Sequence, residues 1–140
     1  MKRNDVIKKL NLIEMDGGNA FQKLIFGKLI LVYFDNQKKY WEKSFNLAEK
    51  VFNSIEILDK NIRDLIDKSY PNIKKELMSI VFSKNCQYFT LRYITRVSSS
   101  PIINEDKIKI NYFIEFNQDL TMRYEIKYYD MEKINGKKIN

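Results

Sequence analysis

One apolar stripe between residues 47 and 70 constrains the fold of this chain more than any other feature of the sequence. Its apolar side chains recur at steps of four, three, four and three residues: Val51, Ile55, Leu58, Ile62 and Leu65. This spacing places them on one face of an α-helix, and the intervening positions are mostly charged or amide residues. The stripe therefore predicts a long central helix that needs an apolar partner surface along one side.

The ends of this helix are predicted from polar residues and from proline. Ser44 or Asn46 is the expected N-cap, because a side-chain oxygen there accepts a hydrogen bond from a free backbone N–H. Pro71 ends the helix or begins the next element, since the residue before a proline avoids the helical region. Asp59 is suited to cap a second helix, so we expect a break close to it. Residues 72–82 have helical spacing of apolar side chains and predict a further short helix.

The residues before the central helix predict a β-hairpin. Residues 21–34 are rich in β-branched and aromatic side chains, residues 35–38 supply a polar turn, and residues 40–45 form the returning strand. Gly27, inside the first strand, predicts a bulge or a close approach of another backbone. Trp41 is the only tryptophan, and we expect it to anchor the core or its rim rather than to stack on a ligand.

The last third of the chain predicts antiparallel strands. Apolar and polar residues alternate over residues 88–97, 107–116 and 120–129, which is the pattern of strands with one buried and one solvated face. The apolar sets are expected to face the helix. Together these elements predict an α+β fold in one domain, residues 1–140. It consists of an N-terminal β-hairpin, a long and broken central helix, and C-terminal antiparallel strands forming a sheet packed on the helix.

The chain contains no histidine and one cysteine, Cys86. No internal disulfide is possible, so we expect a reducing cytoplasmic location. Without histidine the chain lacks the commonest general base, and zinc sites built from Cys and His are excluded. Among the carboxylates, Asp130 and Glu132 are the least well explained by turns or helix-surface pairs. We do not expect catalysis at these two carboxylates. Because the chain lacks histidine and a Cys/His cluster, we predict no catalytic residue, no metal site, no cofactor and no enzymatic activity.

The net charge of +7 is spread along the chain rather than gathered into one basic segment. Lysine outnumbers arginine 20 to 5, whereas selection for phosphate contacts would favour the planar, bidentate arginine. No apolar run approaches the roughly 20 residues that cross a bilayer, so no membrane partner is expected. The composition thus leaves nucleic acid as a possible but not favoured partner.

The polar side of the C-terminal sheet is the candidate binding face. Its predicted members are basic and aromatic: Arg92, Arg96, Lys107, Lys109, Phe113, Arg123, Lys127 and Tyr129. Bases stacking on aromatic rings above a basic sheet would suit single-stranded nucleic acid. Glu115 and Glu125 fall on the same predicted face, so cross-strand ion pairs on a solvated surface explain the pattern equally well. We favour the solvated, ion-paired surface.

Three segments also match a recurrent bacterial pattern. The first, a G-x-L-x-L strand with a nearby aromatic pair, is matched by residues 26–31 and by Tyr40-Trp41. The second is a helical segment, matched by Ala48, Glu49, Ile55, Leu58, Asp59, Ile62 and Arg63. The third is a closing I-x-G-K-x-I, matched by Ile134, Gly136, Lys137 and Ile139. Over residues 21–140 the chain thereby resembles small α+β domains associated with polymorphic-toxin immunity loci.

This resemblance implies a cytoplasmic, non-enzymatic protein that binds a cognate toxin through a sheet face or a loop. The chain departs from the group at Lys137, where a histidine often follows the last glycine. A basic protein is a poor electrostatic match for a nuclease, whose own surface is basic, and this favours another kind of toxin. The alternative for the same outline is a cystatin-like or nuclear-transport-factor-like cone with a small-ligand pocket. An apolar cavity beneath the sheet would distinguish it.

Overall fold

The computed structural model describes residues 1–15, 17–18, 20–35, 41–83, 85–98, 106–133 and 138–139. Its elements in chain order are α1 (Arg3–Lys9), β1 (Ile13–Glu14), β2 (Ala20–Ile25), β3 (Lys28–Phe34), α2 (Trp41–Asn53), α3 (Ile55–Asp67), β4 (Lys75–Ser83), β5 (Tyr88–Ser98), β6 (Asp106–Asn117), β7 (Met122–Lys133) and β8 (Lys138–Ile139). No helix in this described part of the chain has the length and apolarity needed to cross a membrane.

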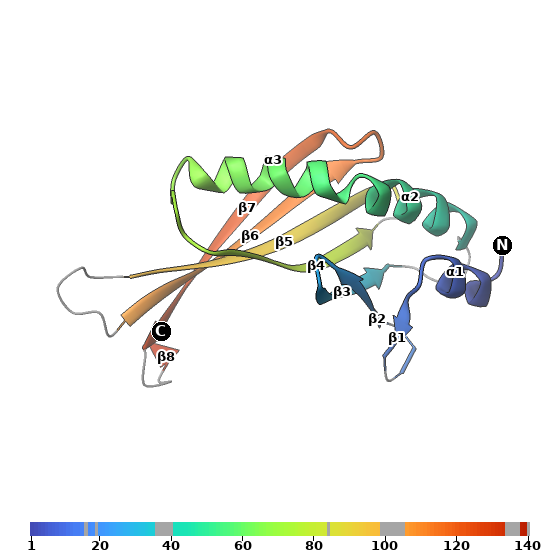
Figure 1. The fold of residues 1–140 in the computed structure, drawn as a ribbon, viewed down its shortest axis with the longest axis horizontal. Helices are drawn as coiled ribbons and strands as arrows, with labels where there is room; N and C mark the ends of the chain where they lie inside the picture. Colours follow the sequence, from blue (N-terminus) through green and yellow to red (C-terminus); the bar gives the residue numbers. More distant parts are fainter. Residues whose placement is uncertain are drawn as a thin grey trace.

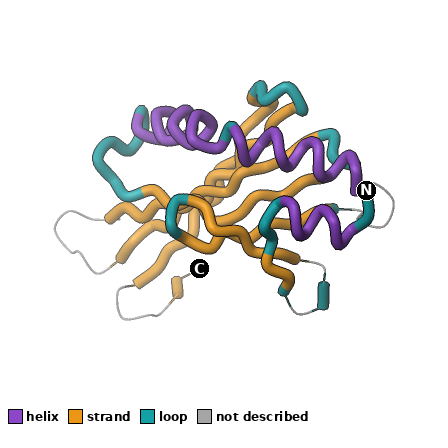
Figure 2. The backbone as a smooth tube through the Cα atoms, turned by 45° about the vertical axis from the view of Figure 1, so that its right-hand side comes forward, coloured by secondary structure: helices purple, strands orange, loops and turns teal. Residues whose placement is uncertain are grey.

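The strands form one mixed sheet whose order follows the chain, from β1 to β8. Neighbouring strands are antiparallel except β3 and β4, which are parallel and are joined by the crossover through α2 and α3. Both crossover helices lie on the same side of the sheet (Figures 1 and 2). We call the surface of the sheet toward these helices the inner face and the opposite surface the outer face. The predicted α+β class is confirmed.

The apolar stripe packs against the inner face as expected. Val51, Leu58 and Ile62 are buried in one cluster with side chains of the sheet. The helix is interrupted at Ser54, however, and not near Asp59, which lies inside α3. Asparagine and serine compete for backbone hydrogen bonds, so the Asn53–Ser54 pair is a natural place for a break. The first helix also begins at Trp41, before either predicted cap.

The N-terminal hairpin is shorter than predicted, and its turn lies at Phe26–Gly27. Both residues have positive φ, 54° and 74°, as a two-residue type I′ hairpin turn requires. Gly27 therefore makes the turn rather than a bulge. The predicted returning strand, residues 40–45, is wrong because α2 occupies residues 41–45; residues 36–40 lie outside the described part. Trp41 packs at the rim of the core, 5.9 Å from the ring of Phe34.

Residues 75–83 form the central strand β4, so the predicted short helix over 72–82 is wrong. This strand pairs in parallel with β3 and antiparallel with β5. A β-bulge between Leu77 and Ser79 shifts the alternation by one residue, so Leu77, Ile80 and Phe82 all face the core. One extra residue in a strand makes the apolar spacing look helical.

Aromatic rings fill the space between the helices and the inner face. Phe34 stacks on Phe82 and Phe89 stacks on Phe116, each with ring centroids 5.0 Å apart. Phe21 meets Phe34 edge-on at 5.8 Å. Such close-packed rings make a solid core beneath the sheet.

Candidate functional site on the outer face of the sheet

Cross-strand register decides which side chains share the outer face. One row across the sheet runs through Leu31, Ser79, Arg92, Phe113 and Ile126, from β3 to β7. The neighbouring row on the inner face runs through the buried residues of the core and ends at Glu125. Directly opposed residues in a sheet point to the same side, so these rows fix the two faces.

The predicted binding residues divide between the two faces. Those on β5 and β6 share the outer face as expected: Arg92, Arg96, Lys107, Lys109 and Phe113. Lys127 and Tyr129 lie on the inner face instead, opposite Tyr112 and Ile110. The Lys127 ammonium lies 5.6 Å from the ring centre of Tyr112. The predicted set is therefore not one surface.

A register shift between β6 and β7 causes this division. Glu115 opposes Tyr124, but the next residue along β6, Phe116, opposes Met122, so Arg123 is the extra residue. From Tyr124 onward, the shift turns the apolar set of β7 outward and its charged set inward, the reverse of the prediction. Arg123 itself reaches the outer face, where its Nη1 donates to Oε2 of Glu115 at 2.6 Å. A one-residue slip exchanges the two sides of a strand.

The outward residues of β7 form an exposed aromatic and aliphatic group that the sequence reasoning missed. Tyr124, Ile126 and Tyr128 are 45%, 40% and 55% exposed. Tyr128 meets the ring of Phe113 edge-on at 5.5 Å. We call Phe113, Tyr124, Ile126 and Tyr128 the β7 patch. Its alternation is visible in the sequence, but only the register shows that it faces away from the helices.

The two arginines beside the β7 patch are already held by neighbouring side chains. Arg92 donates from Nη2 and Nε to Oδ1 of Asn111, at 2.8 and 3.2 Å, and lies 5.6 Å from the ring centre of Phe113. Arg123 pairs with Glu115, which is 7% exposed, and lies 4.3 Å from the ring centre of Tyr88. These guanidinium groups are oriented by the protein and stabilise the outer face.

A second apolar group lies on the outer face at the hairpin. Leu24 and Leu29 oppose each other across β2 and β3 and are 64% and 49% exposed. Tyr33 lies further along β3 on the same face and is also exposed. The outer face therefore carries apolar side chains at both ends.

The unexplained carboxylates do not assemble into a site. Asp130 opposes Lys109 in the register, and the side chain of Glu132 lies outside the described residues. Within the described chain no three Cys, Asp or Glu residues lie together in a way that would hold a metal ion.

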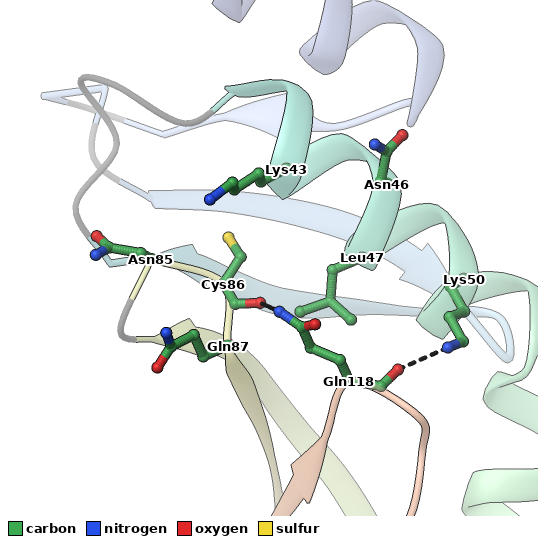
Figure 3. Close-up of a pocket in the computed structure, with 8 residues that line it drawn as sticks. All are labelled: Lys43, Asn46, Leu47, Lys50, Asn85, Cys86, Gln87 and Gln118. Carbon is green, nitrogen blue, oxygen red and sulfur yellow. Dashed lines mark hydrogen bonds between the residues drawn. The ribbon is translucent and has the colours of Figure 1, made fainter.

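A cavity of about 450 Å³ opens at the end of the molecule where α2 meets the β4–β5 and β6–β7 turns (Figure 3). It is lined mainly by amide and lysine side chains: Lys43, Asn46, Leu47, Lys50, Asn85, Cys86, Gln87 and Gln118. Lys50 Nζ donates to the carbonyl of Gln118, and Gln118 Nε2 donates to the carbonyl of Cys86, both at 2.7 Å. These bonds join α2 to the β6–β7 turn and that turn to the β4–β5 turn.

The thiol of Cys86 is structural in character. It is 2% exposed and lies 3.2 Å from the hydroxyl of Ser44, which is also buried. Burial raises the pKa of the Cys86 thiol above its usual value. A protonated, enclosed thiol is a poor nucleophile.

Among the described residues, a buried polar atom on the inner face has no hydrogen-bond partner. The hydroxyl oxygen of Tyr112, on β6, accepts and donates no hydrogen bond within the described structure. Burial, with the nearby hydroxyls of Tyr70 and Tyr129, raises the pKa of Tyr112 to about 12. The Tyr112 hydroxyl therefore stays protonated near neutral pH.

Comparison of the chain with protein-family models, with curated proteins and with solved structures finds no significant match.

Proposed function

We propose that this protein is a non-catalytic binding module that docks another protein on the outer face of its sheet. The observation that carries the proposal is the β7 patch, whose aromatic and aliphatic side chains are exposed on the side that α2 and α3 leave uncovered. Tyrosine and other aromatic side chains are enriched in protein interfaces, where they supply large contact areas. Exposed apolar groups rimmed by polar residues mark such surfaces.

The charges around the β7 patch specify the partner further. Lys107, Lys109 and Arg96 lie on the same face beyond the Tyr128 end of the patch, on β5 and β6, and Asp130 on β7 opposes Lys109. An apolar surface with an acidic rim would complement this arrangement. The partner we propose is therefore a protein with an acidic border, which agrees with the expectation that a nuclease is not the target.

The resemblance to immunity-type domains supplies the class of partner. Under this proposal the chain works in a bacterial cytoplasm, and the docked protein is a cognate toxin. Binding alone would neutralise such a toxin by covering its active surface, so the chain would need no chemistry of its own.

Two other functions are less favoured. The stacked Phe34–Phe82 and Phe89–Phe116 pairs occupy the place where a cone-shaped fold would hold a small ligand. Arginine contacts to phosphates or bases would be weakened here, because Arg123 pairs with a buried carboxylate and Arg92 with an amide. Both observations speak for a protein partner.

The test begins with the gene upstream of this one, which the proposal expects to encode a large secreted toxin-like protein. Co-expression of the two should protect growth, and the purified pair should bind in isothermal titration calorimetry. Phe113→Glu and Tyr128→Glu should each weaken binding at least tenfold. Ile57→Glu places the same charge on the exposed side of α3 and should leave binding unchanged.

Equal weakening by the control and the patch variants would contradict the use of this face, once urea unfolding shows that all variants are folded. Absence of a toxin-like neighbour, or failure of the pair to bind, would contradict the immunity class. A labelled single-stranded oligonucleotide at low salt provides the remaining comparison, because phosphate contacts are strongest there. Tight binding of the oligonucleotide would overturn the proposal in favour of nucleic acid.

A further inference from the structure

Strand β7 presents a long open edge. Along one side it pairs with β6, and along the other it pairs with β8 only at Met131 and Glu132. From Met122 to Asp130 the backbone N–H and C=O groups on that second side have no strand partner in the described chain (Figure 1). An unpaired edge is a template for adding another strand.

In the described chain, side chains of the same stretch are exposed on both faces of the sheet. Residues 121–129 are all exposed, including the inner-face residue Tyr129 at 59%. Natural edges are protected by charged side chains, by proline, by a bulge or by a covering element. Here the register shift lies at the start of β7, beside Arg123, and leaves the remainder of the edge regular.

The sequence of this edge is complementary to itself. Ile126 lies at the midpoint between Met122 and Asp130. When two copies align antiparallel over this stretch, Ile126 opposes Ile126 of the partner subunit. Glu125 then opposes Lys127 of the partner subunit, and Tyr124 opposes Tyr128 of the partner subunit. Each of the last two pairs occurs twice by symmetry.

The two adjacent registers are unfavourable. A two-fold axis perpendicular to the sheet places the inner faces of both copies on the same side. The pairing of the two strands can therefore shift only in steps of two residues. Centring the pair on Glu125 would oppose two glutamates, and centring it on Lys127 would oppose two lysines. Like charges directly opposite destabilise a strand pair, whereas opposite charges and aromatic pairs stabilise it. The full overlap of the two open edges and the best charge pairing thus select the same register.

We propose that two copies of this chain pair antiparallel along β7, with Ile126 at the two-fold axis, and form one continuous sheet. Within one copy Glu125 and Lys127 are 3.8 Å apart, a long contact between exposed groups. Pairing gives each of them a directly opposed partner of opposite charge. The two β7 patches then join across the axis on the outer face. This inference goes beyond the proposed binding function and does not depend on it.

The expected dimer is a reversible one. A single added strand pair buries less surface than a permanent dimer interface, so mass should depend on concentration. Sedimentation velocity from low micromolar to sub-millimolar protein should show the 16.9 kDa monomer converting to a species of twice that mass. A monomer throughout that range would overturn the proposal.

Charge-reversal variants test the register itself. Glu125→Lys and Lys127→Glu should each favour the monomer, because each opposes like charges across the axis. The double variant should restore the dimer, and an equimolar mixture of the two single variants should form a heterodimer. Glu49→Lys on the exposed side of α2 changes the net charge by as much as Glu125→Lys does, and it should have no effect on dimer formation. Dimers insensitive to these changes would overturn pairing along β7.

The two proposals have separable outcomes. A Glu125→Lys variant that is monomeric and still binds its protein partner would support the dimer proposal. It would also show that binding of the partner needs only one copy of the chain. A wild-type monomer that binds the partner through the β7 patch would overturn the dimer alone. A dimer with no protein partner would overturn the binding function alone.

Discussion

The phenolic hydroxyl of Tyr93 in β5 donates a hydrogen bond to the carboxylate of Asp59 in α3. Tyr93 is fully buried, and Arg63 Nε donates to the same carboxylate at 2.9 Å. Arg63 also donates from Nη1 to the carbonyl of Lys75 in β4. Asp59 therefore joins α3 to the sheet, which explains an acidic residue at a position where we expected a helix cap.

Tyr93→Phe should destabilise the protein by about 1 to 3 kcal/mol, because it removes a buried donor to a charged acceptor. The midpoint of urea unfolding, followed by circular dichroism, measures the change. Tyr33→Phe makes the same chemical change at an exposed position and should have little effect. Equal stability of Tyr93→Phe and the wild type would contradict a structural role for this hydrogen bond.

Tyr112→Phe should not destabilise the protein, in contrast to Tyr93→Phe. The hydroxyl of Tyr112 is buried and has no hydrogen-bond partner among the described residues, so its removal relieves a desolvation cost that is typically about 1 kcal/mol or more. We expect unchanged or increased stability in the same urea experiment. A clear loss would mean that an ordered water satisfies this hydroxyl in solution.

Replacing phenylalanine by alanine should cost more stability on the inner face of the sheet than on the outer face. Phe89→Ala removes a stacked ring from the core and should cost about 3 to 5 kcal/mol. Phe113→Ala removes a partly exposed ring from the outer face and should cost roughly 1 kcal/mol. Comparable losses at the two sites would contradict the placement of Phe89 in the core and of Phe113 on a partly exposed surface.

Glu76 should give a pH-dependent contribution to stability. Hydrogen bonds from Lys28 and Lys74 lower the pKa of Glu76 from the usual 4.5 to about 2. A depressed pKa in the folded state stabilises the protein above about pH 4.5, and this contribution is lost as pH falls toward 2. Because both lysines are well exposed, we expect no more than about 1 kcal/mol.

The measurement compares wild type with Glu76→Gln at several pH values. The difference in unfolding free energy should be present near neutral pH and should shrink steadily below the usual glutamate pKa. Glu49→Gln, on the exposed side of α2, provides the control for loss of one negative charge. A constant difference across the acid range would contradict the assigned ion pairs.

Local sequence determined the elements whose pattern is unbroken. The stripe from Val51 to Ile62 predicted helical structure with one buried face, although not the interruption at Ser54, and its burial against the sheet followed from the apolar spacing. The alternation over residues 107–116 correctly predicted the two faces of β6. In both cases one period runs without interruption, so side-chain direction can be counted along the chain.

Tertiary pairing decided the remainder. The bulge between Leu77 and Ser79 gave β4 the apolar spacing of a helix. The register shift between Glu115 and Phe116 exchanged the inner and outer side chains of β7 from Tyr124 onward. Neither shift is written in the apolar pattern of its own strand, because an extra residue is defined only against the neighbouring strand. The sequence by itself determined an α+β chain with a helix-covered sheet. The tertiary structure decided which side chains of β7 reach solvent, since strand register is a property of two strands together.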